Sequence, residues 1–270
     1  MTVTMSANAL ASCCADLYEL PIVEYLLGQS FHPGGTKLTR QLANSALVSR
    51  KSSVLDVACG NGTSARRIAA DFGASVTGCD YSELNLKRAV TSTSAGQLEH
   101  QTRFVRGSAE KLPFAAESFD VALCECSLCL FDDRSTALAE MHRVLKPGGR
   151  IAISDFFLEA PVPKSLDNLL GRILCVAAAP SVAGYRDSLA RAGFEFIRIR
   201  NVNWTLAEMI KRIRNRLGVL AATTAAVETM LPADWGDVAP VLADLERFIA
   251  GGAAGYLMAT ARRNCRSRDS

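Results

Sequence analysis

Two acids and two glycines mark the stretch of this sequence that is best suited to binding a ligand. The run VLDVACGNGTS places Asp56 inside an apolar segment and Gly60 and Gly62 directly after it. A second acid, Asp80, follows Asp56 by 24 residues. Glycines let a backbone approach a ligand with no Cβ in the way, and an acid at the end of the next strand can bind the two hydroxyls of a ribose. The pattern therefore predicts a site for a ligand that contains a nucleoside.

The charge of that ligand separates two classes of protein. Gly60, Gly62 and Ala65 also satisfy the dinucleotide pattern of nicotinamide enzymes. In a dinucleotide site the backbone amides surround a pyrophosphate, and Asp56 would bring negative charge toward it. A ligand with an ammonium group and no phosphate would instead be attracted by this carboxylate. The sequence therefore favours an adenosine ligand with an ammonium group over a dinucleotide.

The elements that must position these residues alternate along the chain between short apolar runs and longer amphipathic segments. This order is typical of a parallel sheet with helices on both faces. We expect helices at Thr63 to Phe72, Glu83 to Ser92, Arg134 to Leu145 and Val182 to Ala192, and strands at Ser53 to Ala58, Ser75 to Asp80, Thr102 to Arg106, Phe119 to Cys124, Arg150 to Asp155, Phe194 to Ile199 and Tyr256 to Ala261. The sequence thus predicts an α/β protein with a seven-stranded, mainly parallel Rossmann-like sheet whose last strand is antiparallel.

Two helical segments are expected outside this core. Residues 1–50 are predicted to form a helical N-terminal lid, with a turn at Phe31 to Gly35 and a second helix from Thr36, followed by the main domain at 51–270. A helical insertion is expected at about 203–250, because apolar residues recur there at helical spacing, namely Leu206, Met209, Ile210, Ile213 and Leu217. This pattern fits a cap over an active site and an ordinary packing helix equally well.

Five stretches, in this order and spacing, resemble the class I S-adenosylmethionine-dependent methyltransferases: VLDVACGNGT, TGCDYS, GSAEKLPF, SFDVALCECSL and HRVLKPGGRIAISD. The resemblance covers Lys51 to Asp155 well and is strongest to the branch that contains quinone and sterol C-methyltransferases and arsenite methyltransferases. It implies a Rossmann-like methyltransferase (EC class 2.1.1) that uses S-adenosylmethionine as cofactor and a small molecule as methyl acceptor.

The resemblance also implies which residues bind the cofactor. Asp56, Gly60 and Gly62 would line its methionine part, and Asp80, followed by Tyr81, would hold the ribose. Ser108, Ala109 and Glu110 would flank the adenine, although the family often has an aspartate where this chain has Ser108, so only a neutral hydroxyl is available there. The remaining cofactor contacts are expected from the strand residue Cys124 and from the lid residue Tyr18.

The number and positions of the cysteines suggest which kind of methyl acceptor the protein uses. The chain has nine, and a cytoplasmic location, which we expect, argues against a disulfide framework. Cys126 follows the fourth predicted strand by two residues, and Cys175 lies where arsenite methyltransferases carry an arsenic-binding thiol. With Cys14 they are candidate ligands for a metalloid, whereas no resident metal is expected. We therefore expect a soft acceptor, trivalent arsenic or a small thiol or sulfide, with Cys126 and Cys175 as candidate catalytic residues.

Alternatives stay open on the acceptor side. The chain lacks the cysteine soon after the glycine loop and the C-terminal cysteine of the arsenite enzymes, and cysteines also pack well in a core. The alternatives are C-methylation of a quinone-like metabolite and a non-catalytic sensor of the cofactor or of a metalloid. His32, before Pro33, is a third candidate catalytic residue, as a base or as a residue closing over the cofactor, and it could equally cap a turn.

Composition excludes several other functions. Of 270 residues 49% are hydrophobic and 21% charged, as in an ordinary globular protein, and the formal net charge of +3 is too small to indicate a nucleic-acid partner. A basic cluster, Lys211, Arg212, Arg214 and Arg216, is predicted to be a solvated helix face. The sequence has no run of eighteen apolar residues, and its first twenty residues lack the basic start and the sustained apolar core of a signal peptide, so we expect no membrane contact. The sequence makes no prediction about the oligomeric state.

Overall fold

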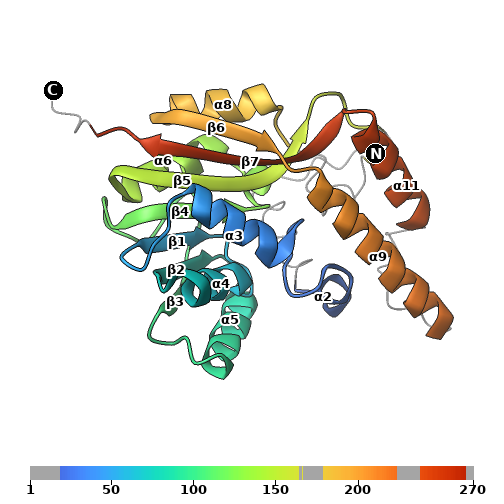
Figure 1. The fold of residues 1–270 in the computed structure, drawn as a ribbon, viewed down its shortest axis with the longest axis horizontal. Helices are drawn as coiled ribbons and strands as arrows, with labels where there is room; N and C mark the ends of the chain where they lie inside the picture. Colours follow the sequence, from blue (N-terminus) through green and yellow to red (C-terminus); the bar gives the residue numbers. More distant parts are fainter. Residues whose placement is uncertain (1–18, 164–165, 167–178, 224–237, 266–270) are drawn as a thin grey trace.

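The computed structural model describes residues 19–163, 166, 179–223 and 238–265. Their centre is a seven-stranded sheet in the order β3-β2-β1-β4-β5-β7-β6 (Figure 1). The six strands β1 to β6 run parallel, and β7 lies antiparallel between β5 and β6. The strands are β1 (Ser53–Val57), β2 (Ser75–Asp80), β3 (Thr102–Arg106), β4 (Phe119–Glu125), β5 (Leu145–Leu158), β6 (Phe194–Asn201) and β7 (Ala254–Arg263). The predicted fold class is confirmed.

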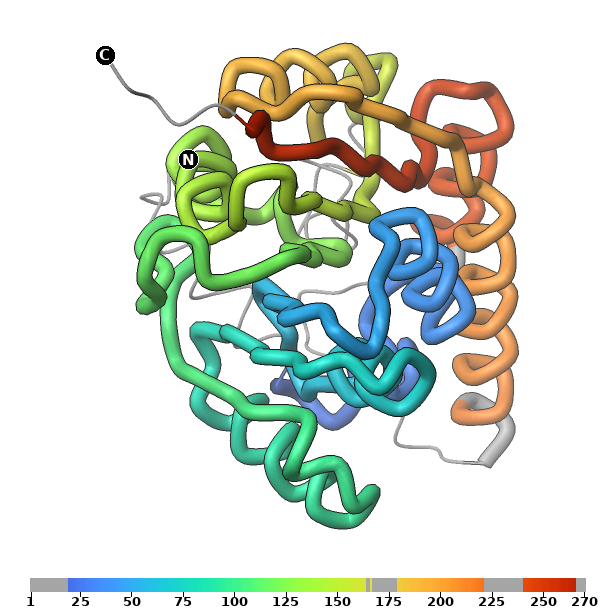
Figure 2. Tube along the Cα trace, turned by 60° about the vertical axis from the view of Figure 1, so that its left-hand side comes forward, coloured from blue at the N-terminus to red at the C-terminus, as the bar shows by residue number. Residues whose placement is uncertain are grey.

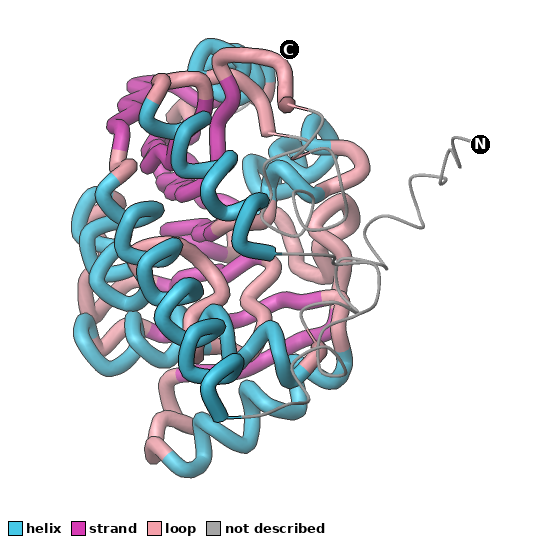
Figure 3. Tube along the Cα trace, turned by 90° about the vertical axis from the view of Figure 1, so that its right-hand side faces the viewer, coloured by secondary structure: helices cyan, strands magenta, loops and turns pink. Residues whose placement is uncertain are grey.

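Helices cover both faces of the sheet, as Figure 3 shows in cyan beside the magenta strands. On one face α2 (Pro21–Leu27), α3 (Gly35–Ser45), α4 (Thr63–Phe72), α9 (Trp204–Thr223) and α11 (Val238–Ala250) share an apolar core with the sheet. On the other face the core is completed by α6 (Arg134–Val144) and α8 (Val182–Arg191). Among the described residues there are also α5 (Glu83–Ala95), which contacts β2 and β3, and the short 3-10 helix η1 (Leu128–Leu130).

Strand β1 shows why the sequence folds in this way. Val54 belongs to the core on the α3 and α4 face, and its neighbour Leu55 belongs to the core on the α6 face. Successive side chains of a strand point to opposite faces, so a strand that is covered on both sides reads as a continuous apolar run. A polar side chain inside such a run, as at Asp56, therefore indicates a role other than packing.

The predicted strands are confirmed, but β5 is longer than expected. It begins at Leu145, directly after α6, and ends at Leu158, whereas the sequence pattern predicts Arg150 to Asp155. The Lys146-Pro147-Gly148-Gly149 stretch reads as a loop in the sequence, because proline and glycine usually interrupt regular structure. Here Leu145 already pairs with Phe119, and a register shift in the ladder follows. The irregularity is absorbed within the strand pair.

The basic residues of α9 are not a simple solvated face. Arg216 donates hydrogen bonds to the carbonyl oxygens of Tyr25 (2.5 Å) and Leu26 (3.1 Å), and Arg212 donates to that of Leu27 (3.2 Å). The last carbonyls of a helix lack partners within it and attract cations, so these arginines complete the C-terminal end of α2. Figure 2 shows α9, in orange, along the outside of the molecule beside the blue N-terminal elements. The prediction of a solvated face is wrong for Arg212 and Arg216.

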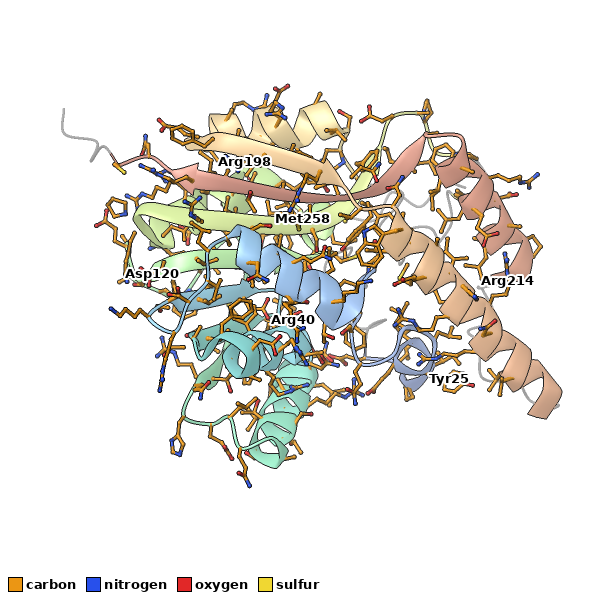
Figure 4. The ribbon with its side chains drawn as sticks, in the orientation of Figure 1. Tyr25, Arg40, Asp120, Arg198, Arg214 and Met258 are labelled. Carbon is orange, nitrogen blue, oxygen red and sulfur yellow. The ribbon has the colours of Figure 1, made fainter. Side chains whose placement is uncertain are left out.

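Arg214 of α9, which Figure 4 labels, instead pairs with Glu246 of α11 at 2.8 Å. In the described parts of the chain, no helix combines the length and the apolar character that crossing a bilayer would require.

Candidate active site

A cavity of about 610 Å³ opens at the carboxyl ends of β1, β2 and β4. Its wall comes from the loops that follow these strands, from the loop after β3, and from the segment Gln29 to His32 ahead of α3. Ligands of open α/β sheets bind outside the carboxyl ends of the strands. None of the described residues that line the cavity belongs to α9 or α11, which favours the packing alternative for this insertion over the cap.

The loop between β1 and α4 turns sharply through three residues with positive φ, Ala58 (56°), Gly60 (52°) and Gly62 (73°). Gly60 lies on the cavity wall, where a Cβ would come within 3.4 Å of the Phe31 ring. Gly62 does not line the cavity, and a Cβ there would come within 2.7 Å of the Phe104 ring. The sequence predicts that Gly62 lets the backbone approach the cofactor. In the structure its lack of a side chain instead lets the loop pack against β3.

Asp56 lies on the cavity wall and is only 2% exposed. One of its carboxylate oxygens, Oδ2, has no hydrogen-bond partner in the described part of the chain. Burial raises the pKa of Asp56 well above its ordinary value, and the neighbouring carboxylates of Glu125 and Asp80 add to this effect. A buried carboxylate with one unpartnered oxygen suits the ammonium group of a ligand.

Asp80 ends β2 on the same wall and is held by two backbone amides. Gly60 N donates to its Oδ2 at 2.7 Å, and Ser82 N donates to its Oδ1 at 2.8 Å. Burial raises the pKa of Asp80, and these hydrogen bonds partly oppose the rise. The carboxylate is thus oriented before any ligand arrives, as a group that binds two ribose hydroxyls must be. Tyr81, which follows it, is 57% exposed and also lines the cavity.

The residues expected around the adenine form a small loop after β3. Ser108, Ala109 and Glu110 all line the cavity. The Ser108 hydroxyl donates to the Glu110 carboxylate and accepts from Glu110 N at 3.1 Å. Since this hydroxyl is engaged within the loop, Glu110 and the backbone of Ala109 are the better candidates for an adenine contact.

Some of the described cysteines are buried in the apolar core, and others line the cavity. Cys124 is fully buried in the core on the α6 face and does not line the cavity, in contrast to its expected cofactor contact. Cys126 does line it, with a left-handed backbone at φ 55° that ends β4. Cys59 and Cys79 line the cavity near Asp56 and Asp80, and burial raises the pKa of Cys79 to about 12.

The described residues contain no group of three or more His, Cys, Asp or Glu side chains that could hold a metal ion. Three other candidates lie outside the described residues: Tyr18, Cys14 and Cys175.

His32 belongs to a buried polar cluster that the sequence does not reveal as a unit. Its Nδ1 lies 3.1 Å from the carbonyl oxygen of Pro33, and its Nε2 lies 3.6 Å from Glu125 Oε2. Thr39 of α3 and Ser64 of α4 complete the cluster with hydrogen bonds to Glu125. His32, Ser64 and Glu125 line the cavity. The only signal in the sequence is a carboxylate inside the Cys124-Glu125-Cys126 strand end.

The segment before His32 is attached to the glycine loop. The carbonyl oxygen of Gln29 accepts hydrogen bonds from Asn61 Nδ2 at 3.0 Å and from Thr63 Oγ1 at 2.9 Å. Nearer the N-terminus, Ser82 Oγ donates to the Glu19 carboxylate at 2.5 Å. The described part of the N-terminal segment therefore borders the cavity and is fixed to the elements that carry Asp56 and Asp80.

Comparison with known proteins gives consistent results. Residues 55–153 match the family model described as "Methyltransferase domain". The chain is 35% identical over 172 residues to the O-methyltransferase rstn1 of Aspergillus nomiae, covering 63% of this chain and 76% of the relative. It is 32% identical over 190 residues to the 27-O-demethylrifamycin SV methyltransferase of Amycolatopsis mediterranei, covering 64% of this chain and 70% of the relative.

Among solved structures, the [4+2]-cyclase SpnF superimposes with a TM-score of 0.79 at 24% identity, covering 95% of this chain and 97% of that one. The Haemonchus contortus phosphoethanolamine N-methyltransferase 2, in complex with S-adenosyl-L-methionine, gives a TM-score of 0.78 at 18% identity, covering 97% of this chain and 61% of that one. At these identities the two structures establish a shared fold.

Proposed function

Because the chain belongs to the S-adenosylmethionine-dependent methyltransferases that act on small molecules, we propose that it methylates a hydroxyl oxygen of its acceptor. The observation that carries the proposal is His32, a buried imidazole on the cavity wall beside Glu125. Several relatives are named as O-methyltransferases, among them rstn1, resE and cnsE, and this supports an oxygen acceptor. The narrower placement in the quinone, sterol and arsenite branch stays a prediction.

The cofactor is S-adenosylmethionine, which supplies a methyl group on a positively charged sulfur. We assign its ammonium group to Asp56, whose buried Oδ2 has no partner in the described chain, and its ribose to Asp80. Gly60 lets the backbone approach the ligand. Residues Tyr81, Ala109 and Glu110 on the wall are assigned to the ribose and adenine side.

His32 is assigned the role of base. A hydroxyl is a weak nucleophile, so its proton must leave as the new bond forms, and a positioned imidazole is the commonest acceptor for such a proton. The contact of Nδ1 with the Pro33 carbonyl fixes the ring, since a carbonyl oxygen can only accept. Nε2 is then the nitrogen available for proton transfer.

A soft acceptor is the second candidate, and Cys126 is the observation that favours it. This thiol lies on the cavity wall, where it can meet trivalent arsenic or a small thiol, which need no base. Of the three cysteines predicted as metalloid ligands, Cys126 is the one that the structure describes. C-methylation of a quinone-like ring and non-catalytic sensing of the cofactor or a metalloid stay open as well.

Methyl transfer from labelled cofactor to a matched acceptor panel tests the proposal. The panel contains a phenol, an aliphatic alcohol, an amine, methanethiol, arsenite and a quinol, each with the parent, His32→Asn and Cys126→Ser. We expect transfer to a hydroxyl compound that falls at least a hundredfold in His32→Asn and stays unchanged in Cys126→Ser. Transfer to arsenite or a thiol that depends on Cys126 would establish the soft acceptor instead. Cofactor binding without transfer to any acceptor would favour the sensor.

Two expectations accompany this proposal and stay predictions: the absence of a nucleic-acid partner and a cytoplasmic location. The division into a lid at 1–50 and a main domain at 51–270 is likewise a prediction.

A further inference from the structure

Glu125 connects four parts of the fold that lie far apart in the sequence. It is the last residue of β4 and is 8% exposed. Its Oε2 accepts hydrogen bonds from Ser64 Oγ at 2.6 Å and from Thr39 Oγ1 at 3.0 Å. His32 Nε2 lies 3.6 Å from the same oxygen. One carboxylate thus contacts α3, α4 and the turn that carries the proposed base.

The hydrogen bonds of this cluster are compatible with two protonation states of His32. Nδ1 of His32 carries a proton, because the Pro33 carbonyl can only accept. Around Nε2 lie the hydroxyl oxygens of Thr39 and Ser64, both at 3.4 Å, and the Glu125 carboxylate. When both hydroxyls donate to Glu125, only a proton on Nε2 makes its contacts with these oxygens attractive. When Nε2 carries no proton, one hydroxyl can turn and donate to it. The cluster therefore fits both protonation states of His32 with a hydroxyl rotation alone.

The charges around the cluster come from few groups. Among the described residues lining the cavity there is no lysine and no arginine, and Asp56 on β1 is a further carboxylate that interacts electrostatically with Glu125. Tyr256 of β7 also faces Glu125, and burial raises the pKa of this phenol well above its ordinary value, so it stays neutral. Within this surrounding, a protonated His32 is the cation that Glu125 can pair with.

We propose that Glu125 is a positioning residue for the methyl transfer, which holds His32 together with Ser64 and Thr39 and balances the charge that His32 acquires. This inference rests on the proposed function. In the step concerned, the hydroxyls of Thr39 and Ser64 both donate to Glu125, and the acceptor hydroxyl is the group that donates to Nε2 of His32. The acceptor O–H bond breaks and its proton goes to Nε2. The oxygen electron pair forms the new bond to the methyl carbon, and the electrons of the carbon–sulfur bond go to sulfur. Glu125 stays a carboxylate throughout.

The test compares Glu125→Gln and Glu125→Asp with the matched control Glu117→Gln, a half-exposed glutamate that pairs with Arg263 away from the cavity. We expect all three variants to bind S-adenosylhomocysteine within about threefold of the parent by calorimetry. In Glu125→Gln we expect kcat to fall about a hundredfold at nearly unchanged acceptor KM, a typical contribution of proton transfer. Glu125→Asp should recover part of the loss, and Glu117→Gln should match the parent.

A spectroscopic readout keeps the test independent of turnover. The chain has three histidines, so the imidazole ¹⁵N signals of His32 can be assigned by their loss in His32→Asn. We expect the parent to show a proton on Nδ1, and the Nε2 signal to move in Glu125→Gln but not in Glu117→Gln. If Glu125→Gln does not fold, as judged by its melting curve, Ser64→Ala and Thr39→Val replace it, with an expected fall in kcat of about three- to tenfold each.

Three results would overturn the proposal: an unchanged kcat in Glu125→Gln, a loss of S-adenosylhomocysteine affinity as large as the loss of kcat, or an unmoved Nε2 signal. Failure of the proposed function looks different, because a parent protein that transfers no methyl group to a hydroxyl compound would still give the ¹⁵N result.

Discussion

Asp56 is the residue whose protonation should respond most directly to the cofactor. Its pKa in the folded protein is raised, first by burial and then by Glu125 and Asp80. The folded state therefore binds this proton more tightly than the unfolded chain, and the group destabilises the fold increasingly as pH rises from its ordinary pKa toward the raised value. A cationic group bound beside it favours the carboxylate, so binding should release a proton.

We predict that S-adenosylmethionine binding below this raised pKa is accompanied by proton release. Calorimetry in buffers with different ionisation enthalpies measures the release. Asp56→Asn should abolish it and weaken binding about 10- to 100-fold, because it removes a charged partner of a buried ammonium group. The exposed Asp187→Asn is the control and should behave as the parent. Binding of equal strength in Asp56→Asn would refute the assignment.

Cysteine reactivity gives a second test at the level of residues. Burial raises the pKa of Cys79 to about 12 and that of Cys59 well above its ordinary value, so both stay thiols at pH 8. Because the thiolate is the reactive form, iodoacetamide should modify the exposed Cys265 and spare both residues. Peptide mass spectrometry after a short exposure measures this, with Cys265→Ser as control. Rapid labelling of Cys79 would show that the strand end is more open than described.

The candidate site could be predicted from the sequence only where its residues are local. Asp56 and Asp80 follow from their positions at strand ends. Glu125 was missed because its hydroxyl partners, Thr39 and Ser64, are 86 and 61 residues away, and no periodic pattern encodes such contacts. The cofactor contact predicted for Cys124 is not found, because this side chain points into the core on the α6 face, whereas Cys126, two residues later, lines the cavity.

At the level of elements, the loop between β1 and α4 depends on Gly62. A Cβ there would lie 2.7 Å from the Phe104 ring, and φ is 73°. We predict that Gly62→Ala destabilises the protein by about 2–4 kcal/mol, the sum of overpacking and left-handed strain. Gly218→Ala on α9 is the matched control, since no atom of the described residues lies within 4 Å of its added Cβ, and it should be neutral or stabilising by up to about 1 kcal/mol. Urea unfolding measures both, and equal values would contradict the packing argument.

The contact between α9 and α2 predicts an effect at a distance from the cavity. Arg216 completes the end of α2, and the chain then continues through Gln29 to His32 on the cavity wall. Arg216→Ala should loosen this segment and weaken S-adenosylhomocysteine binding severalfold by calorimetry. Arg214→Ala removes only the pair with Glu246 and should leave binding unchanged. Equal affinities in both variants would show that α9 does not support the site.

The extents of the elements were less predictable than their order. Strand β2 and helix α4 have the predicted bounds, because glycines and polar residues flank each of them. Strand β5 gained residues at both ends, because Leu145 pairs with Phe119 of β4 at its start and Leu158 pairs with Ala254 of β7 at its end. A partner that is distant in the sequence therefore decides where this strand ends.

For the whole molecule, the cofactor should stabilise the fold by mass action. At a concentration of a hundred times its Kd, a ligand that binds only the folded state adds about 2.7 kcal/mol, which corresponds to a rise in Tm of about 5–10 °C for a chain of this length. We predict this rise with S-adenosylhomocysteine and none with NAD at the same concentration, by scanning calorimetry. A shift with NAD alone would restore the dinucleotide reading of the glycine loop.

The overall architecture was predictable because alternating strands and helices admit few arrangements. The position of α9 against the sheet could not be predicted, because its apolar residues, such as Leu206 and Ile210, would suit a cap over the active site and a packing helix equally well. They belong to the core on the face of α3 and α4. Whether α9 forms a cap or packs on the sheet depends on which apolar surface the assembled sheet leaves uncovered beside β7.

The position of β7 between β5 and β6 has a consequence for synthesis on the ribosome. Translation delivers β6 before β7, so β6 has no neighbour in the sheet until residues 254–263 emerge. Until then a nascent polypeptide exposes the unpaired edge of β5, which is a surface that invites association with other chains. Chaperones that shield emerging chains would therefore be needed most during translation of the stretch from β6 to β7.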